Sequence, residues 1–340
     1  MMRTMKKIIL LAFVGIVAFG SWHLWYVRAL QPVASHDTAR MVVVIPRGSS
    51  TADIAAILEE KGLIRSASAF KRFVKRSGKA ETLQAGSFSL MRSMDAEAIL
   101  NALTGGPSEE AVITIPEGYT VKDIDHLLSE KGLIKEGDVL ACASECDFSS
   151  YAFLPKTVGA QRGGRMEGYL FPDTYFVIAD GFQAEAFLKR LLDTFQARVV
   201  EALAPDLKQS QRSVHEIVTM ASLLEEETRT AEERPVVAGI LWKRFDEGVG
   251  LYVDAAIRYI LGKPTGALTA ADLSIDSPYN LRKYRGLPPG PIANPGMESI
   301  RASLHPEESD YYYYLHGSDG AIHYAVTNDE HNSKKARYLQ

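Results

Sequence analysis

The sequence predicts an α+β protein with an N-terminal transmembrane helix, two small αβ modules and a C-terminal α+β domain. Three observations lead to this fold class. They are an apolar run near the N-terminus, a segment that occurs twice, and an amphipathic helix that carries three consecutive glutamates. A chain of 340 residues has room for two or three domains.

The composition is that of ordinary globular protein, with 46% hydrophobic and 24% charged residues. The net charge of −4 gives no sign of nucleic-acid binding, so no nucleic-acid partner is expected.

The N-terminal segment has the length and flanks of a membrane anchor. Basic residues at positions 3, 6 and 7 precede Ile8 to Val27, which contains no Asp, Glu, Lys or Arg. At about 1.5 Å per residue this run crosses the ~30 Å hydrocarbon core, and the leading charges favour a cytoplasmic N-terminus. The alternative is a cleaved signal peptide. We favour the anchor because the run ends in Trp25 and Tyr26 rather than in a small-residue cleavage site.

The two cysteines leave two interpretations open. Cys142 and Cys146 are four residues apart, so they either form a disulfide or pack as small helix thiols. The neighbouring residues offer no His or Cys that would complete a zinc site, and no metal is expected.

A repeat determines the middle of the chain. The segment Val43 to Ile64 aligns with Ile113 to Ile134 without gaps at a constant offset of 70. Each copy predicts a short strand, a Pro-x-Gly turn and a helix of period 3.6 that ends at Gly62 or Gly132. The copies resemble LysM glycan-binding modules, and the alternative is a duplicated structural spacer without a ligand.

The segment from Ser213 to Glu227 predicts the helix with the glutamates. Ser213 and Glu216 form a capping box, and apolar residues at helical spacing predict a buried face. On the helical wheel Glu225 lies on one flank of that face, the residue after it points to the polar side, and Glu227 lies on the other flank. Desolvation at a flank raises the pKa of a carboxyl, as a general acid requires, and the alternative is a helix-end ion pair.

Motifs for several other chemistries are absent. His215-Glu216 is not followed by a second His at the spacing of a zinc protease, and no G-x-S-x-G, Walker or dinucleotide motif occurs. No cofactor is therefore expected.

Six segments in order resemble the membrane-anchored endolytic murein transglycosylases of bacteria. They are IPEGYT (115–120), EGYLFPDTY (167–175), ASLLEEET (221–228), VDAAIRYILG (253–262), SPYNLRKYRGLPPGPIANPG (277–296) and HYAVTNDEHN (323–332). The resemblance covers nearly the whole chain. It implies a cytoplasmic stub and transmembrane helix at residues 1–28 and a linker at residues 29–40. A LysM-like module is implied at residues 41–105, and a second LysM-like repeat, joined to the catalytic domain, at residues 106–180. The catalytic domain is implied at residues 181–340.

The resemblance implies that Glu225 is catalytic. The family often has Lys at the next position, where this chain has Glu226, so the local electrostatics differ. The implied reaction is non-hydrolytic cleavage of the MurNAc–GlcNAc bond, in which the MurNAc 6-hydroxyl attacks C1 and yields a 1,6-anhydro end. Because the substrate supplies its own nucleophile, one carboxyl can serve as acid and then as base, whereas hydrolytic glycosidases use two.

Further residues are candidates for substrate binding. The Pro- and Gly-rich segment predicts a stiff loop in which tyrosine faces and an amide suit sugar rings, or else a plain surface connection. A hairpin is predicted from Tyr311 to Val326 around positions 318–320. The candidates are Tyr279, Asn280, Tyr284, Glu167, His323, Thr327 and His331.

The resemblance also implies location and partners. We expect a single-pass protein of the cytoplasmic membrane whose catalytic domain lies outside it, with peptidoglycan strands as substrate and penicillin-binding-protein glycan synthases as partners. The rival hypothesis is a non-catalytic glycan-binding scaffold for those synthases, which would have no need of an acid at Glu225.

Overall fold

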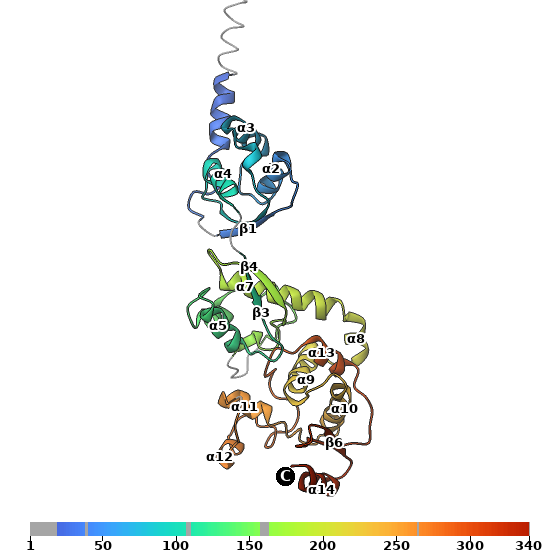
Figure 1. The fold of residues 1–340 in the computed structure, drawn as a ribbon. Coiled ribbons are helices and arrows are strands. Elements are labelled where there is room, and N and C mark those ends of the chain that lie inside the picture. Colours follow the sequence, from blue (N-terminus) through green and yellow to red (C-terminus); the bar gives the residue numbers. More distant parts are fainter. Residues whose placement is uncertain (1–18, 38–39, 107–109, 157–162, 264, 340) are drawn as a thin grey trace, which may run out of the picture. The chain divides into compact units, whose positions relative to one another are not determined.

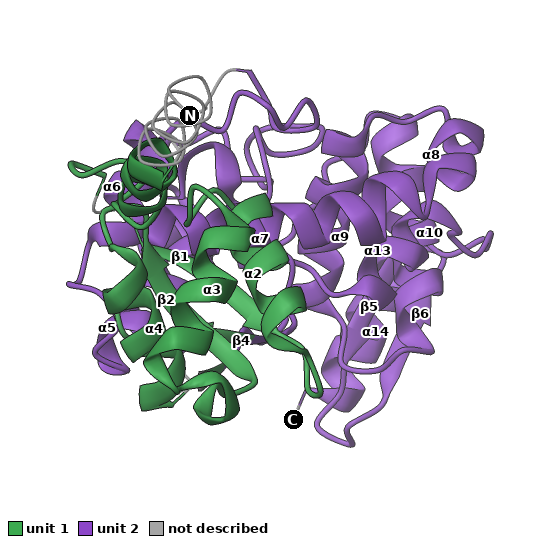
Figure 2. Ribbon diagram, turned by 90° about the horizontal axis from the view of Figure 1, so that it is seen from above, with its two compact units in different colours: residues 1–112, 176–182 green, residues 113–175, 183–340 purple. Residues whose placement is uncertain are grey.

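The computed structural model describes residues 19–37, 40–106, 110–156, 163–263 and 265–339. The chain divides into two compact units (Figure 2). Unit 1 comprises Met1–Val112 with Phe176–Phe182, and unit 2 comprises Ile113–Tyr175 with Gln183–Gln340. The chain therefore passes from one unit to the other three times.

Unit 1 is a two-stranded sheet covered by three helices (Figure 1). The antiparallel strands are β1 (Arg40–Ile45) and β2 (Gly86–Met91), with Arg40 opposite Met91. In β1, Val43 and Ile45 are buried and Val44 between them is exposed, the alternation of a half-buried strand. The helices are α2 (Thr51–Glu60), α3 (Ala67–Ser77) and α4 (Ala96–Gly105), with a 3₁₀ turn at Ala80–Thr82.

The expected membrane anchor lies mostly outside the described residues. A helix is described from residue 19 to 29, and its C-terminal end packs on α3 through Tyr26 and Ala29. The guanidinium of Arg72 lies 4.6 Å from the ring of Trp22. Within the described ranges, no helix is long and apolar enough to cross a membrane.

Unit 2 begins with the second copy of the repeat. Strands β3 (Glu110–Thr114) and β4 (Thr174–Ile178) form a two-stranded sheet, although each also extends into unit 1. Between them lie α5 (Val121–Glu130), α6 (Asp138–Glu145) and a 3₁₀ turn at Gly164–Met166.

The remainder of unit 2 is mostly helical. Helices α9 (Val214–Glu227) and α13 (Met297–Leu304) lie side by side in both ribbon views, and every residue of α9 from Ile217 to Leu224 is buried. A hairpin of β5 (Tyr313–His316) and β6 (Ile322–Ala325) confirms the predicted hairpin. The helices are α7 (Ala184–Phe195), a π-helical turn at Gln196–Glu201, α8 (Ala204–Ser210), α9 (Val214–Glu227), α10 (Glu233–Asp246), α11 (Ala255–Leu261), α12 (Ala270–Leu273), α13 (Met297–Leu304) and α14 (Asn328–Tyr338).

The predicted strand–turn–helix unit is confirmed in both copies. The turn glycines have nearly the same positive φ, 82° at Gly48 and 81° at Gly118. The helix-end glycines agree as well, at 66° for Gly62 and 69° for Gly132. Both helices also begin with a capping box, which Ser50 and Thr120 form with the Asp three residues further on. The copies lie in different units, and their strands pair with different partners, β2 and β4.

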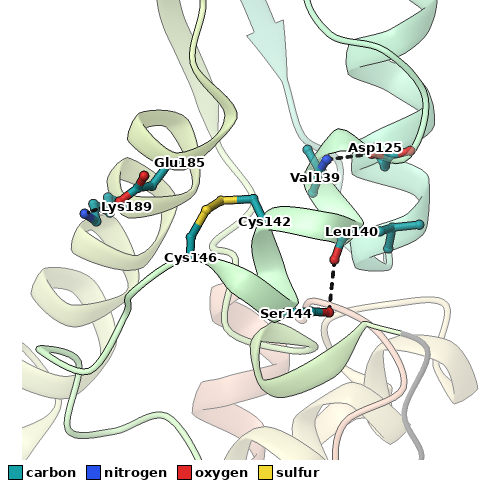
Figure 3. The surroundings of a disulfide bond; sticks show 8 residues. All are labelled: Asp125, Val139, Leu140, Cys142, Ser144, Cys146, Glu185 and Lys189. Atoms are coloured by element: carbon teal, nitrogen blue, oxygen red, sulfur yellow. Dashed lines mark hydrogen bonds and ion pairs between the residues drawn. A yellow bond between two sulfur atoms is a disulfide. The ribbon is translucent and has the colours of Figure 1, made fainter. Parts of the chain in front are cut away.

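The structure joins Cys142 and Cys146 in a disulfide at the end of α6 (Figure 3), one of the two interpretations left open by the sequence. The start of α6 is held by Asp125, whose carboxyl accepts hydrogen bonds from the backbone N–H groups of Gly137 at 2.7 Å and Val139 at 2.9 Å.

Candidate active site

The helix that carries the glutamates begins and ends on local signals. Ser213 caps its N-terminus together with Glu216, as predicted. At the other end the hydroxyl of Thr228 donates to the carbonyl of Leu224 at 2.6 Å. The three glutamates therefore occupy the last turn of a helix that is buried from Ile217 to Leu224.

Glu225 is held by three donors from two other helices. Its Oε2 accepts hydrogen bonds from the backbone N–H of Gly296 at 2.9 Å and the hydroxyl of Ser299 at 2.7 Å. Its Oε1 lies 3.4 Å from Nη2 of Arg234, and the side chain of Glu225 is only 8% exposed. Gly296 is the N-cap of α13, so the carboxylate lies at the positive end of that helix. Arg234 also pairs with Glu298 at 2.8 Å.

Glu226 faces a cavity of about 340 Å³ between α5, α9 and α11. The side chain is open to the cavity, yet protein atoms crowd its other sides. This burial raises the pKa of Glu226 to about 7, with further contributions from the negative charges of Glu225 and Asp123. The cavity is lined by Gly118, Thr120, Lys122, Asp123, Glu167, Glu226, Ala255, Arg258, Tyr259, Gly262 and Ile292. In the part of the chain that the structure describes, no group of three or more His, Cys, Asp or Glu could hold a metal ion.

Glu227 connects the helix to the C-terminal hairpin. It accepts a hydrogen bond of 2.9 Å from the hydroxyl of Tyr314 in β5. Burial raises the pKa of Glu227 to about 7, although the bond from Tyr314 opposes the shift. The carboxyl therefore serves as a buried tie between α9 and β5.

Glu167 forms part of the cavity wall. It is 1% exposed, and it accepts hydrogen bonds from the backbone N–H of Val121 and the hydroxyl of Tyr259, both at 3.0 Å. Burial raises the pKa of Glu167 to about 8, against the effect of those two bonds. The structure thus places this candidate next to the cavity and links the start of α5 to α11.

Asn294 brings the other motifs together and was not singled out from the sequence. It is fully buried, and its backbone exchanges two hydrogen bonds of 2.9 Å with the turn at Gly118 and Tyr119. Its side-chain amide donates to the carbonyl of Tyr119 at 2.7 Å and accepts from the N–H of Leu170 at 2.9 Å. Beside it, the N–H of Ile292 donates to the hydroxyl of Ser222 in α9 at 3.1 Å.

Glu117 was also missed by the sequence reasoning. It lies in the turn of the second repeat, and its carboxyl packs against Gly296. Burial and the negative charge of Glu225 raise the pKa of Glu117, while Arg234 lowers it. The sequence did contain a sign of a role for Glu117. The two copies of the repeat match closely around the turn, yet the first copy has Arg47 where the second has Glu117.

The candidates in the Pro- and Gly-rich segment are not among the residues that line the cavity. Tyr279 is buried with its ring 5.6 Å from that of Tyr259. Asn280 is also buried, and its amide donates to the backbone carbonyls of Leu273, the last residue of α12, and Ile275 in the loop that follows. Tyr284 is 44% exposed and donates to Asp276 at 2.8 Å. Their roles in binding remain predictions.

The three C-terminal candidates make contacts within the hairpin and α14. His323 pairs with Asp319 at 2.9 Å and stacks on a tyrosine of α14. Thr327 is the N-cap of α14. His331 stacks on Tyr313 with ring centroids 5.1 Å apart, and burial lowers its pKa. Binding of substrate by these residues remains a prediction.

Comparison with known proteins agrees with the family that the motifs predict. The YceG-like family matches residues 43–337. A Bacillus subtilis (strain 168) protein named endolytic murein transglycosylase is 35% identical over 318 residues, which cover 91% of this chain and 88% of that protein. A Streptococcus pneumoniae (serotype 2, strain D39) protein with the same name is 30% identical, and the match covers 97% of this chain and 64% of that protein. The 2.6 Å crystal structure of a putative YceG-like protein from Listeria monocytogenes has a TM-score of 0.61 and 32% identity, covering 87% of this chain and 99% of that one.

Proposed function

The chain belongs to the YceG-like family, and we propose that it is an endolytic lytic transglycosylase that cleaves MurNAc–GlcNAc bonds of peptidoglycan and leaves 1,6-anhydro ends. The predicted family is confirmed, and the predicted enzyme class, a lyase, is confirmed by the names of the relatives. The observation that carries the proposal is the placement of Glu225, a nearly buried carboxyl that directly precedes Glu226, one of the residues that line the cavity; Glu225 itself is not among them.

The proposed chemistry needs two proton transfers and no added nucleophile. The glycosidic oxygen takes a proton as the bond to C1 breaks, and the 6-hydroxyl of MurNAc loses a proton as its oxygen attacks C1. Glu225 is the carboxyl at the centre of this exchange. The N-terminus of α13 holds it in one orientation through Gly296 and Ser299, so it costs little to position when substrate binds.

The cavity next to Glu225 supports a carbohydrate ligand. Its lining combines charged groups with the hydroxyls of Thr120 and Tyr259, and such convergent polar groups suit a ring with many hydroxyls. The rival hypothesis of a non-catalytic scaffold accounts for a glycan site. It does not account for a nearly buried carboxyl that is held by three donors and directly precedes a residue of the cavity wall.

The proposal also covers the location of the protein, the role of the two repeats and the partners. We place residues 8–27 in the cytoplasmic membrane with unit 2 outside it, because the run has the length of a span and follows basic residues. The two repeats are proposed as LysM-like glycan-binding modules, and membrane-bound glycan synthases as partners, so that cleavage would terminate or release nascent strands.

The test is digestion of purified cell-wall sacculi by the full-length chain, with mass spectrometry of the products. Wild type should release fragments with anhydro ends, and Glu225→Gln should release none above background. A product with reducing ends would contradict the transglycosylase and indicate a hydrolase. Binding of sacculi without any cleavage would favour the scaffold.

A further inference from the structure

Two carboxyls border the same glycine in this site. The N–H of Gly296 donates to Oε2 of Glu225 at 2.9 Å. A Cβ added to Gly296 would lie 1.9 Å from Oε1 of Glu117 and 2.0 Å from its Cδ. The missing side chain of Gly296 is what allows the Glu117 carboxyl to lie there.

The turn that carries Glu117 does not need an acidic residue to fold. The first copy of the repeat has Arg47 at the same place, and its turn has the same backbone, with φ of 82° at Gly48 against 81° at Gly118. The fold of the turn therefore does not explain why this position is a glutamate. Its neighbours in unit 2, Glu225 and Gly296, do.

The charges around the two carboxyls differ. Three donors stabilise a negative charge on Glu225, namely Gly296, Ser299 and Arg234. The groups that act on Glu117 are Glu225 and Glu298, which oppose its ionisation, and Arg234, which favours it. Burial and the two acidic neighbours raise the pKa of Glu117, and the residue is open to solvent on its outer side. Glu225 thus meets hydrogen-bond donors on both of its oxygens, whereas the burial and acidic neighbours of Glu117 favour its protonated form.

We propose that Glu117 is the proton donor of the cleavage reaction and that Glu225 is its base. This assignment rests on the proposed function and divides the two proton transfers between two residues.

In the forward step, the carboxylic acid of Glu117 gives its proton to the glycosidic oxygen, which leaves with the electron pair of its bond to C1. The carboxylate of Glu225 takes the proton of the 6-hydroxyl as a lone pair of that oxygen forms the new bond to C1. One proton leaves Glu117 and one arrives at Glu225, and exchange with water then restores both groups. No other reactant is required.

The test compares Glu117→Gln with Arg47→Gln, the same replacement at the matching place of the first repeat. The full-length variants digest sacculi across about pH 5 to 9, and kcat, KM and thermal unfolding are measured. Glu117→Gln should lower kcat by about 10²-fold, leave KM within a few fold, and abolish the loss of activity that is expected of the wild type as pH rises. Arg47→Gln should change neither kcat nor the pH profile.

Two further variants distinguish the loss of the acidic group of Glu117 from a change in the local structure. Glu117→Arg installs the residue of the first repeat, so the turn should fold while the acid is lost. Gly296→Ala keeps both carboxyls and has a backbone that any residue adopts, φ −73°, yet its methyl group displaces Glu117. It should lower kcat and move the loss of activity to lower pH, because Glu117 leaves the surroundings that raise its pKa.

The assignment is wrong if Glu117→Gln keeps the wild-type profile, or if its loss lies in KM alone, since a proton donor acts on kcat. These failures differ from failure of the proposed function. If the proposed function is wrong, the wild type itself releases no anhydro ends. If only the assignment of Glu117 is wrong, the wild type is active, Glu225→Gln is inactive, and Glu117→Gln matches the wild type.

Discussion

At the residue scale, three adjacent glutamates have three different surroundings. Glu225 is held by the N-terminus of α13, Glu226 faces the cavity, and Glu227 is tied to Tyr314. The helical wheel separates them because successive residues differ by about 100°. It cannot say which elements lie opposite each one.

The first prediction concerns these three positions. Glu225→Gln keeps the size of the side chain and one acceptor oxygen for Gly296 and Ser299, but it loses the ion pair with Arg234 and cannot exchange the proton, so kcat for release of anhydro ends should fall by roughly 10²–10⁴-fold. Glu226 lines the cavity but takes no part in the proposed proton transfers, so Glu226→Gln, which keeps the size of the side chain, should leave turnover within a few fold. Glu227→Gln should lower activity partly through lower stability, because it changes a buried tie between α9 and β5. If Glu225→Gln folds normally and cleaves at the wild-type rate, Glu227 becomes the candidate.

A second prediction concerns pH and Glu167. Its pKa is raised from an ordinary 4.5 to about 8, so the folded state holds the proton more tightly than the unfolded chain does. The resulting stabilisation is fully present below about pH 4.5 and is lost as pH rises through about 8.

Glu167→Gln removes this titration and keeps the contacts to Val121 and Tyr259. Urea unfolding at several pH values should therefore show a flatter dependence of stability on pH for the variant. Parallel curves for the two proteins would contradict the assignment. Glu130→Gln, on the exposed end of α5, is the control.

At the element scale, the site depends on loops held by one side chain. Asn294 joins the turn at Gly118 to Leu170 and lies in the loop before α13. Since α13 in turn positions Glu225, the orientation of the carboxyl depends on this connection.

We predict that Asn294→Ala is strongly destabilising. It leaves the N–H of Leu170 and the carbonyl of Tyr119 with one buried partner fewer, at about 1–3 kcal/mol each. Chemical denaturation should show a loss of roughly 2–5 kcal/mol. The control, Asn332→Ala on the exposed face of α14, should change stability by less than about 0.5 kcal/mol. An equal effect of both substitutions would exclude a special role for Asn294.

At the scale of the whole molecule, the two copies of the repeat have different structural roles. The first copy lies in unit 1, while the second lies in unit 2 and lends its turn to the glutamate site. Duplication of a strand–turn–helix unit thus supplied both a separate module and a wall of the candidate active site.

The prediction for the whole molecule concerns its N-terminal membrane anchor. The mature protein should retain the N-terminus through Val27 and sediment with membranes, because the run is long enough to span and lacks a small-residue cleavage site. N-terminal sequencing after fractionation checks this. A chain that begins near Gln31 in a membrane-free extract would show a cleaved signal peptide instead.

The sequence by itself determined the elements whose signals are local. The capping box at Ser213, the matching turns of the repeat and the glycines with positive φ involve residues a few positions apart, and the structure confirms each of them. The family followed from six motifs in order, and its match over residues 43–337 agrees.

Only the tertiary structure decided which of these motifs meet. Asn294 contacts Tyr119 across 175 positions, and Glu167 contacts Tyr259 across 92. It also buried Tyr279 and Asn280, which the sequence had suggested for a groove, and it brought Glu117 onto Gly296 beside Glu225. Helical period and turn chemistry are set by neighbouring residues, whereas such contacts depend on how distant segments pack, which no local pattern records.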